Sequence, residues 1–362
     1  MGSGRTKLGE PYRVGLVGCG FFAQNHLAAW HALPDVRLVA VCDLDADKAE
    51  AASAQYSATP YTSAEEMLRR ERLDFVDIAT TMRSHRALVE LAVAHRLPLI
   101  VQKPLAPSWA DCVALVANCR DAGVPMMVHE NTRFLSPIRA VRDIVARGKI
   151  GPLTWGRVAF RTGYDIYAGQ PYLAQETEFI LLDLGVHMLD IARFLLGEVE
   201  SLYCQAQQIR PGLSGEDIAT VMLKHRGGAV SVVECSYASR LDPDPFPQVL
   251  VELEGRDGSL SLQPGYRLVV CSNGRRTERD VSPPLLPWAT PPWHGVQESV
   301  LAIQRHWVDC FARGAAPETD GSDSLRTYGL VFAAYDSART GRAVQPLSPG
   351  PAPVTGDELH AG

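Results

Sequence analysis

The sequence predicts an α/β protein in which a doubly wound parallel sheet is followed by an α+β domain with an open, mostly antiparallel sheet. Residues 13–26 begin as an apolar, β-branched run and break into glycines and then into helix-compatible residues. Up to residue 129, strand-like runs alternate with helical patterns, which is typical of parallel β-α-β units. Beyond residue 150, strand-like runs follow one another through short hairpin signals such as Asn273-Gly274.

The first half is expected to form one domain over residues 11–129. Thr62 with Glu65, and Ser108 with Asp111, have the spacing of helix-starting caps. Gly123 is placed to end the last helix. After the strand that precedes the glycines, we expect strands at 36–43, 75–79, 97–101 and 126–129 and helices at 45–56, 62–70, 84–95 and 108–122. Such domains bind ligands at the carboxyl ends of their strands.

The second half is expected to form a domain over residues 130–346. Its helices are expected at 137–147, 179–196, 297–313 and 324–340, and its strands at 153–161, 199–207, 219–225, 229–237, 248–254, 259–263 and 268–272. The length of 362 residues fits two domains. The tail, residues 347–362, is rich in proline and glycine and is expected to be disordered.

The glycine turn of residues 18–23 has the pattern of a dinucleotide-binding Rossmann domain. Gly18 would make the tight turn out of the strand, Gly20 would let the backbone approach a pyrophosphate, and Ala23 would keep the next helix close to the sheet. Phe21 and Phe22 lie within the turn and are counted with the cofactor residues. The free N–H groups of the helix would then face the phosphates.

Asp43 ends the second apolar run, 23 positions after Gly20 (43 minus 20). A carboxylate at this distance accepts hydrogen bonds from a ribose 2′-hydroxyl and repels a 2′-phosphate. Leu44 follows, where an NADP site favours Arg or Ser. The predicted cofactor is therefore NAD rather than NADP. The alternative interpretation makes Asp43 a cap of the next helix.

Composition excludes several other classes of protein. The net charge is −6 and no long basic run is present, so nucleic acid is not an expected partner. No apolar stretch has the length of a membrane span, and residues 1–10 lack the apolar core of a signal peptide. The eight cysteines form no C-x-x-C pair and mostly lie in apolar runs. These features indicate a cytoplasmic protein without disulfides and without membrane partners.

The expected helix 179–196 carries Asp183, His187 and Asp190 at positions i, i+4 and i+7, and therefore on one face. Unpaired buried charges are costly, so this polar face in an apolar helix indicates a polar cleft suited to acid-base chemistry. Two alternatives stay open, which are a core histidine held by Asp190 and a metal site. No further cluster of metal ligands is present in the sequence, so no metal is expected.

Lys103, in V-Q-K-P-L-A, follows a predicted strand at the edge where a nicotinamide is expected. Pro104 restricts the backbone of Lys103 and so fixes where the ammonium group points. A lysine before a proline is otherwise most often a surface residue.

Four motifs together resemble the Gfo/Idh/MocA family of oxidoreductases, over residues 12–346. They are V-G-C-G-F-F-A with Asp43, Q-K-P in place of the family's E-K-P, D-x-G-x-H-x-x-D at residues 183–190, and W-H-G-V-Q-E-S at residues 293–299. The resemblance implies a Rossmann domain plus a sheet domain that often makes dimers and tetramers. It also implies NAD(P)-dependent oxidation of a sugar or cyclic polyol.

The resemblance implies catalytic roles for three residues. Lys103 would hydrogen-bond the reacting hydroxyl, Asp183 would bind substrate and His187 would shuttle the proton. Gln102 replaces the family's glutamate, which removes a charge near the nicotinamide and is expected to loosen the orientation of Lys103. The glycine-rich lead-in of the family is absent before Asp183, so substrate-side packing is expected to differ.

Further residues near the predicted strand ends are candidates for binding. Thr80, His85 and Gln102 are expected to border the cofactor, although His85 could instead be a helix-start residue. The substrate candidates, besides Lys103, Asp183 and His187, are Asn131, Arg133, Tyr164 and Asp165. Trp293 and its aromatic neighbours lie among prolines and are expected to fill a gap.

The expected function is therefore an NAD-dependent dehydrogenase that oxidises a hydroxyl of a pentose, a branched pentose such as apiose, a hexose or an inositol. A glycoside hydrolase that uses NAD for transient oxidation is the second hypothesis, and an NAD-binding sensor without catalysis is the third. We expect a homodimer or homotetramer that joins through the sheet of the second half.

Overall fold

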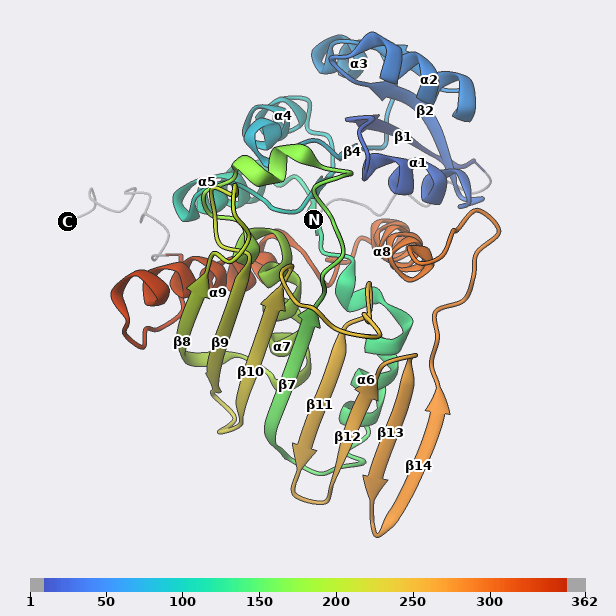
Figure 1. Ribbon diagram of the computed structural model, residues 1–362. Helices are drawn as coiled ribbons and strands as arrows, with labels where there is room; N and C mark the ends of the chain where they lie inside the picture. The colour runs from blue at the N-terminus through green and yellow to red at the C-terminus, as the bar shows by residue number, and fades with distance from the viewer. Residues whose placement is uncertain (1–9, 350–362) are drawn as a thin grey trace, which may run out of the picture.

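The computed structural model describes residues 10–349 and contains two sheets (Figure 1). The N-terminal sheet has six parallel strands in the order β3-β2-β1-β4-β5-β6. This is the strand order of dinucleotide-binding domains, and the predicted fold class is confirmed. Its strands are β1 (Tyr12–Val17), β2 (Val36–Cys42), β3 (Thr59–Tyr61), β4 (Phe75–Ile78), β5 (Leu99–Gln102) and β6 (Met126–His129).

The helices of this half begin at side-chain caps in three cases. Asp45 accepts from the Asp47 N–H, and Ser108 accepts from the Asp111 N–H. The third cap is Ser63, which accepts from the Glu66 N–H, so the expected pair of Thr62 and Glu65 was wrong by one residue. The helices are α1 (Ala23–His31), α2 (Ala46–Tyr56), α3 (Ala64–Arg70), α4 (Met82–Ala94) and α5 (Trp109–Asp121).

The second sheet has eight strands in the order β14-β13-β12-β11-β7-β10-β9-β8. Its strands are β7 (Leu153–Arg161), β8 (Val199–Gln207), β9 (Ile218–His225), β10 (Val230–Ser236), β11 (Leu250–Gly255), β12 (Gly258–Gln263), β13 (Arg267–Ser272) and β14 (Arg275–Asp280). Only β7 and β10 pair in parallel among these strands, so the sheet is mostly antiparallel as predicted.

The sequence did not predict β14, although it did predict the turn before it. Every residue of β14 is exposed, and the strand sequence RRTERD has no apolar alternation. Asn273 and Gly274 both have positive φ, 52° and 70°, and join β13 to β14 as a two-residue hairpin. The cysteines are all free, as expected, but Cys271 is exposed rather than in the core.

Helices cover one face of the second sheet. α6 (Ser136–Ala146), α7 (Val186–Leu196) and α9 (Gly321–Thr340) pack against its strands. No helix of residues 10–349 is both long enough and apolar enough to cross a membrane. The opposite face of the sheet carries no helix in Figure 1. The short helices η1 (Thr132–Phe134) and η2 (Pro171–Gln175) lie in connecting segments.

α8 (His294–Arg313) returns from the second half and packs against α1 of the first (Figure 1). Trp307 meets Phe75 at 5.7 Å between ring centroids, and Ile303 belongs to the same buried cluster as Trp30. The core of the first half is therefore completed by the second half. The predicted boundary between residues 129 and 130 stays a prediction, and residues 350–362 of the predicted tail lie outside the described residues.

The helix expected at 179–196 is not a single α-helix. It begins with a π-helical turn, η3 (Leu181–Gly185), and continues as α7 up to Gly197. A π turn inserts an extra residue into the helical ladder and is frequent at functional sites. Asp183 and His187 face a common cavity, whereas Asp190 does not share that face.

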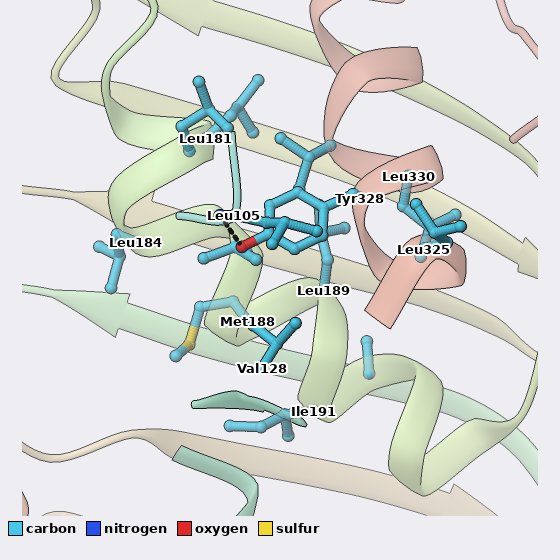
Figure 2. Close-up of a cluster of buried hydrophobic side chains, with 14 of the residues drawn as sticks. Leu105, Val128, Leu181, Leu184, Met188, Leu189, Ile191, Leu325, Tyr328 and Leu330 are labelled. Carbon is cyan, nitrogen blue, oxygen red and sulfur yellow. Dashed lines mark hydrogen bonds between the residues drawn. The ribbon is translucent and has the colours of Figure 1, made fainter. Parts of the chain in front are cut away.

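A buried apolar cluster joins η3 and α7 to α9 (Figure 2). Leu181, Leu184 and Met188 belong to it from one side and Leu325 from the other. Within this cluster the Tyr328 hydroxyl accepts a 2.7 Å hydrogen bond from the Leu105 N–H, and the Tyr335 hydroxyl accepts one of 3.3 Å from the Leu182 N–H. The backbone that follows β5 is thereby fixed to α9.

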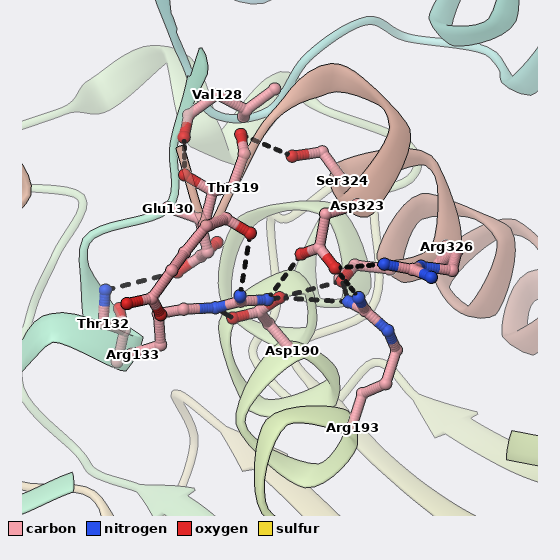
Figure 3. A network of polar contacts seen from close by, with 12 residues as sticks. Val128, Glu130, Thr132, Arg133, Asp190, Arg193, Thr319, Asp323, Ser324 and Arg326 are labelled. Carbon is pink, nitrogen blue, oxygen red and sulfur yellow. Dashed lines mark hydrogen bonds and ion pairs between the residues drawn. The ribbon is translucent and has the colours of Figure 1, made fainter. Parts of the chain in front are cut away.

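A buried network of charges joins the segment after β6 to α7 and α9 (Figure 3). The Arg133 guanidinium donates to the Asp190 carboxylate at 2.7 Å and to Asp323 at 2.9 Å. Arg193 donates to Thr327 at 2.6 Å and contacts Asp323. The exposed fractions of Arg133 and Asp190 are 4% and 2%. Asp190 therefore holds an arginine rather than a histidine.

Replacing Asp190 by Ala should lower the free energy of unfolding by about 3–5 kcal/mol, because it leaves a buried guanidinium short of its charge partner. Urea unfolding followed by circular dichroism measures this. Asp143→Ala, which removes an exposed partner of Arg147, is the control and should change stability by less than about 1 kcal/mol. Equal midpoints for the two variants would contradict a stabilising role for the network.

Candidate active site

A cavity of about 930 Å³ lies at the carboxyl ends of the parallel strands, between the two sheets. One side is formed by the residues that end or follow β1, β2, β4 and β5. The other side is formed by η3, the start of α7 and loops of the second half. The volume is in the range of small-molecule sites.

The glycine turn has the geometry that a dinucleotide requires. Gly18 has φ of 97°, and a Cβ there would lie 2.6 Å from the Ala79 carbonyl oxygen. A Cβ at Gly20 would have no atom within 4 Å, so the backbone is open to the cavity at this point. Phe21 and Phe22 also line the cavity, whereas Ala23 is buried beneath the turn, as a close helix-sheet contact requires.

Asp43 lies at the rim of the cavity, at the end of β2. Its carboxylate accepts from the Cys19 N–H at 2.7 Å and from the Asp45 N–H at 3.0 Å. The cap of α2 is Asp45, so the alternative interpretation of Asp43 as that cap was wrong. The Asp43 carboxylate is held in place, and its position suits a ribose hydroxyl.

His85 does not reach the cavity. It is fully buried, and its two ring nitrogens contact the Leu105 carbonyl at 3.0 Å and the Thr80 carbonyl at 3.1 Å. Burial lowers the pKa of His85. The expectation that His85 borders the cofactor is therefore not met. It connects the backbone of Thr80, which does line the cavity, to that of Leu105.

The Lys103 ammonium group donates to the Asp183 carboxylate and to the Asp183 carbonyl, each at 2.9 Å. The other carboxylate oxygen of Asp183 accepts from the Tyr237 hydroxyl at 2.9 Å. Burial raises the pKa of Asp183, but the nearby Lys103 ammonium group and the hydrogen bond from Tyr237 lower it by a larger amount. The pKa of Asp183 therefore lies below its usual value. A cation and an ionised carboxylate therefore face the same part of the cavity.

His187 lines the cavity, and its Nδ1 contacts the Glu130 carboxylate. Among residues 10–349, its Nε2 has no hydrogen-bond partner. Burial raises the pKa of Glu130, but His187, Lys103 and Arg133 together bring it below its usual value. Glu130 was missed from the sequence, although its position directly after β6 placed it at the correct edge of the sheet. Tyr237 was also missed, because nothing marks it except the end of β10.

Gln102 is held rather than loose. Its side-chain oxygen accepts from the Lys103 N–H at 2.6 Å, and its amide nitrogen lies 3.0 Å from Nε2 of His26. Nδ1 of His26 lies 2.8 Å from the Asp77 carboxylate. The expected loosening of Lys103 is therefore not seen, because a chain of buried side chains fixes Gln102.

Of the four further residues expected to bind substrate, Asn131 lines the cavity, whereas Arg133, Tyr164 and Asp165 do not. Asn131 lines the cavity and donates to Ser299 at 2.7 Å. Arg133 is bound in the buried charge network and does not line the cavity, contrary to expectation. Tyr164, which stacks on Phe246 with centroids 4.0 Å apart, and Asp165, which accepts from the Tyr167 N–H, are both exposed, and neither lines the cavity.

Aromatic rings form part of the cavity lining, and we call Phe21, Phe160, Tyr237, Phe246 and Trp293 the aromatic wall. Phe246 and Trp293 meet edge to face at 5.2 Å, and Phe21 meets Trp293 at 6.2 Å. Trp293, expected to fill a gap, is thus exposed to the cavity. No cluster of potential metal ligands is present in residues 10–349.

Comparisons with known proteins match both halves of the chain. Residues 12–130 match the oxidoreductase family with an NAD-binding Rossmann fold, and residues 138–261 match the GFO/IDH/MocA C-terminal domain. D-apiose dehydrogenase of Rhizobium rhizogenes is 47% identical over 91% of this chain and 96% of its own length. D-apiose dehydrogenase of Paraburkholderia graminis is 47% identical over 95% of this chain and 92% of its own length.

Solved structures have the same architecture. An oxidoreductase from Agrobacterium radiobacter, crystallised with NAD+, L-tartaric acid and magnesium, is 46% identical with a TM-score of 0.91, over 92% of this chain and 98% of that one. A levoglucosan dehydrogenase in complex with NADH has a TM-score of 0.80 at 20% identity, over 93% of this chain and 100% of that one. The second likeness supports the fold alone.

Proposed function

Because this chain belongs to the Gfo/Idh/MocA family of NAD-binding oxidoreductases, we propose that its substrate is D-apiose or a closely related branched pentose. The chain is an NAD-dependent sugar dehydrogenase that acts on a CH–OH group. The finer assignment to apiose rests on the two relatives of that name, each of which aligns over more than nine-tenths of its own length.

The chemistry of the cavity supports a small polyhydroxylated substrate. Lys103 and Asp183 offer a donor and an acceptor to neighbouring hydroxyls, and Asn131 adds an amide. The aromatic wall offers apolar surface to the C–H groups of a sugar. A compact sugar in the cavity would therefore have both polar groups and aromatic rings within reach.

NAD, when bound, accepts the hydride that leaves the substrate carbon. We assign the remaining work to three side chains. Lys103 donates a hydrogen bond to the reacting oxygen and stabilises negative charge that develops on it. Nε2 of His187 accepts the hydroxyl proton. Asp183 keeps the ammonium group of Lys103 in place and accepts a hydrogen bond from substrate.

Substrate identity is tested by a panel of D-apiose, D-xylose, D-glucose and myo-inositol with NAD, followed by the absorbance of the reduced nicotinamide. D-apiose should give a kcat/KM at least about tenfold above the others, equal to about 1.4 kcal/mol of transition-state binding. A higher value for inositol or glucose would contradict the apiose assignment. Absence of net NAD reduction with every sugar would instead favour the glycoside-hydrolase hypothesis.

The catalytic roles predict that Lys103→Ala and His187→Ala each lower kcat by roughly 100-fold or more, because each removes a group that acts on the reacting oxygen or its proton. The affinity for NAD, measured by fluorescence titration, should change little. Lys149→Ala and His95→Ala, both at exposed positions, are the matched controls. Near-normal turnover of either site variant would overturn its assigned role.

We also propose a cytoplasmic homodimer or homotetramer that joins through the uncovered face of the second sheet. On β9, Val221 and Leu223 are buried towards the helices, so Met222 between them points to that face and is 50% exposed. Val230 at the start of β10 is 37% exposed. The same face carries the Arg157–Glu234 and Lys224–Glu200 ion pairs, so it offers a second copy both exposed apolar side chains and charges.

Light scattering at micromolar concentration should give at least twice the mass of one chain. Met222→Glu should shift the mass towards the monomer, because it would bury a charge in the interface. Gln55→Glu, on α2 of the other half, is the control and should not change the mass. A wild-type mass of one chain would disprove this assembly.

A further inference from the structure

We propose that Glu130 is a positioning residue of this active site: it holds His187 in the proton-accepting form and supplies, from the end of β6, the negative charge that Gln102 lacks at the end of β5. The inference rests on the proposed role of His187 as proton acceptor. Two independent sets of contacts lead to it, one around Gln102 and one around Glu130.

The surroundings of Gln102 favour an amide over a carboxylate. The buried Asp77 carboxylate faces Nδ1 of His26 at 2.8 Å, so that nitrogen carries the proton. Nε2 of His26 then has a lone pair, and it lies 3.0 Å from the amide nitrogen of Gln102, which can donate to it. A glutamate at position 102 would set a carboxylate oxygen against this lone pair. The family's charge is therefore disfavoured at this position by His26 and Asp77.

The Glu130 carboxylate supplies a negative charge at the end of β6, the strand next to β5. Gln102 pairs with His129 across β5 and β6, and Glu130 follows directly. Glu130 is 4% exposed and accepts from the Thr132 N–H at 3.3 Å as well as facing His187. Lys103 and His187 both favour its ionised form. Lys103 therefore interacts electrostatically with the Glu130 carboxylate, and a glutamate at position 102 would have been the direct neighbour of the same lysine.

An ionised Glu130 determines which nitrogen of His187 accepts a proton. A carboxylate can only accept, so Nδ1 of His187 must donate to it. Nε2 then carries the lone pair, and it is the ring nitrogen that has no hydrogen-bond partner within residues 10–349. When the substrate O–H bond breaks, its proton moves to Nε2, and the imidazolium is stabilised by Glu130, which keeps its negative charge. Later loss of the same proton from Nε2 to water restores His187.

The first test needs no variant of Glu130 or Gln102. Nitrogen-15 NMR of the NAD-saturated wild-type enzyme, at a pH where turnover is maximal, should show His187 with Nδ1 protonated and Nε2 bare. The His187 signals are identified by their loss in His187→Ala. A proton found on Nε2 instead of Nδ1 would overturn the inference, whether or not any Glu130 variant folds.

The second test is kinetic. Glu130→Gln should lower kcat with D-apiose by at least about tenfold, because an amide can face His187 with its NH2 group as well as with its oxygen. KM, NAD affinity and the melting temperature should stay near wild-type values. Glu130→Asp, which keeps the charge, should recover part of kcat. Gln102→Glu should not compensate for Glu130→Gln in the double variant, because His26 opposes a carboxylate there.

Glu71→Gln is the matched control, since it makes the same exchange at a mostly buried carboxylate that contacts Tyr61 and does not line the cavity. It should leave kcat unchanged. Normal kcat in Glu130→Gln, or equal losses in the Gln and Asp variants, would overturn the inference. If His187→Ala is inactive while Glu130→Gln is normal, this inference alone fails. If His187→Ala itself keeps its turnover, the proposed function of His187 fails as well.

Discussion

The Lys103–Asp183 ion pair is the contact on which the rest of the site depends. Lys103 directly follows β5 and Asp183 lies in η3, in different halves of the chain, and their side chains are 15% and 19% exposed. Partly buried charges stabilise a site only when their geometry is fixed by further hydrogen bonds. Tyr237 fixes Asp183, while Gln102 fixes the backbone of Lys103. Tyr328 fixes the residues that follow. Contacts from both halves of the chain thus fix the distance between the Lys103 ammonium group and the Asp183 carboxylate.

Most elements could be predicted because apolar periodicity and turn residues are local signals. The parallel strands, the hairpin at Asn273-Gly274 and the cap Ser108 all follow from neighbours within a few positions. β14 could not be predicted, since an edge strand exposed on both faces needs no apolar residues. The π turn was also hidden, because its extra residue is stabilised by packing against α9 rather than by a local sequence signal.

The candidate site was predictable where one residue type and one place in the fold suffice, as for Gly18, Gly20 and Asp43. It was not predictable where a side chain's role is decided by a distant partner. Arg133 was expected to bind substrate, but Asp190 and Asp323 hold it in the interior. Glu130 shows the converse, because its importance is visible only when His187, 57 residues away, is seen beside it. Charged residues at strand ends identify a region, and their partners decide which of them are available to a ligand.

The return of α8 to the first half has a consequence for how the molecule unfolds. Trp30 and Phe75 would be exposed to water if the chain ended after β6, since Ile303 and Trp307 cover them. The apolar surface of the nucleotide-binding sheet is therefore exposed to water when the second half is unfolded, and this exposure is unfavourable. We therefore expect the two halves to unfold together, so that free energy gained when a dinucleotide binds at the glycine turn also stabilises the distant eight-stranded sheet.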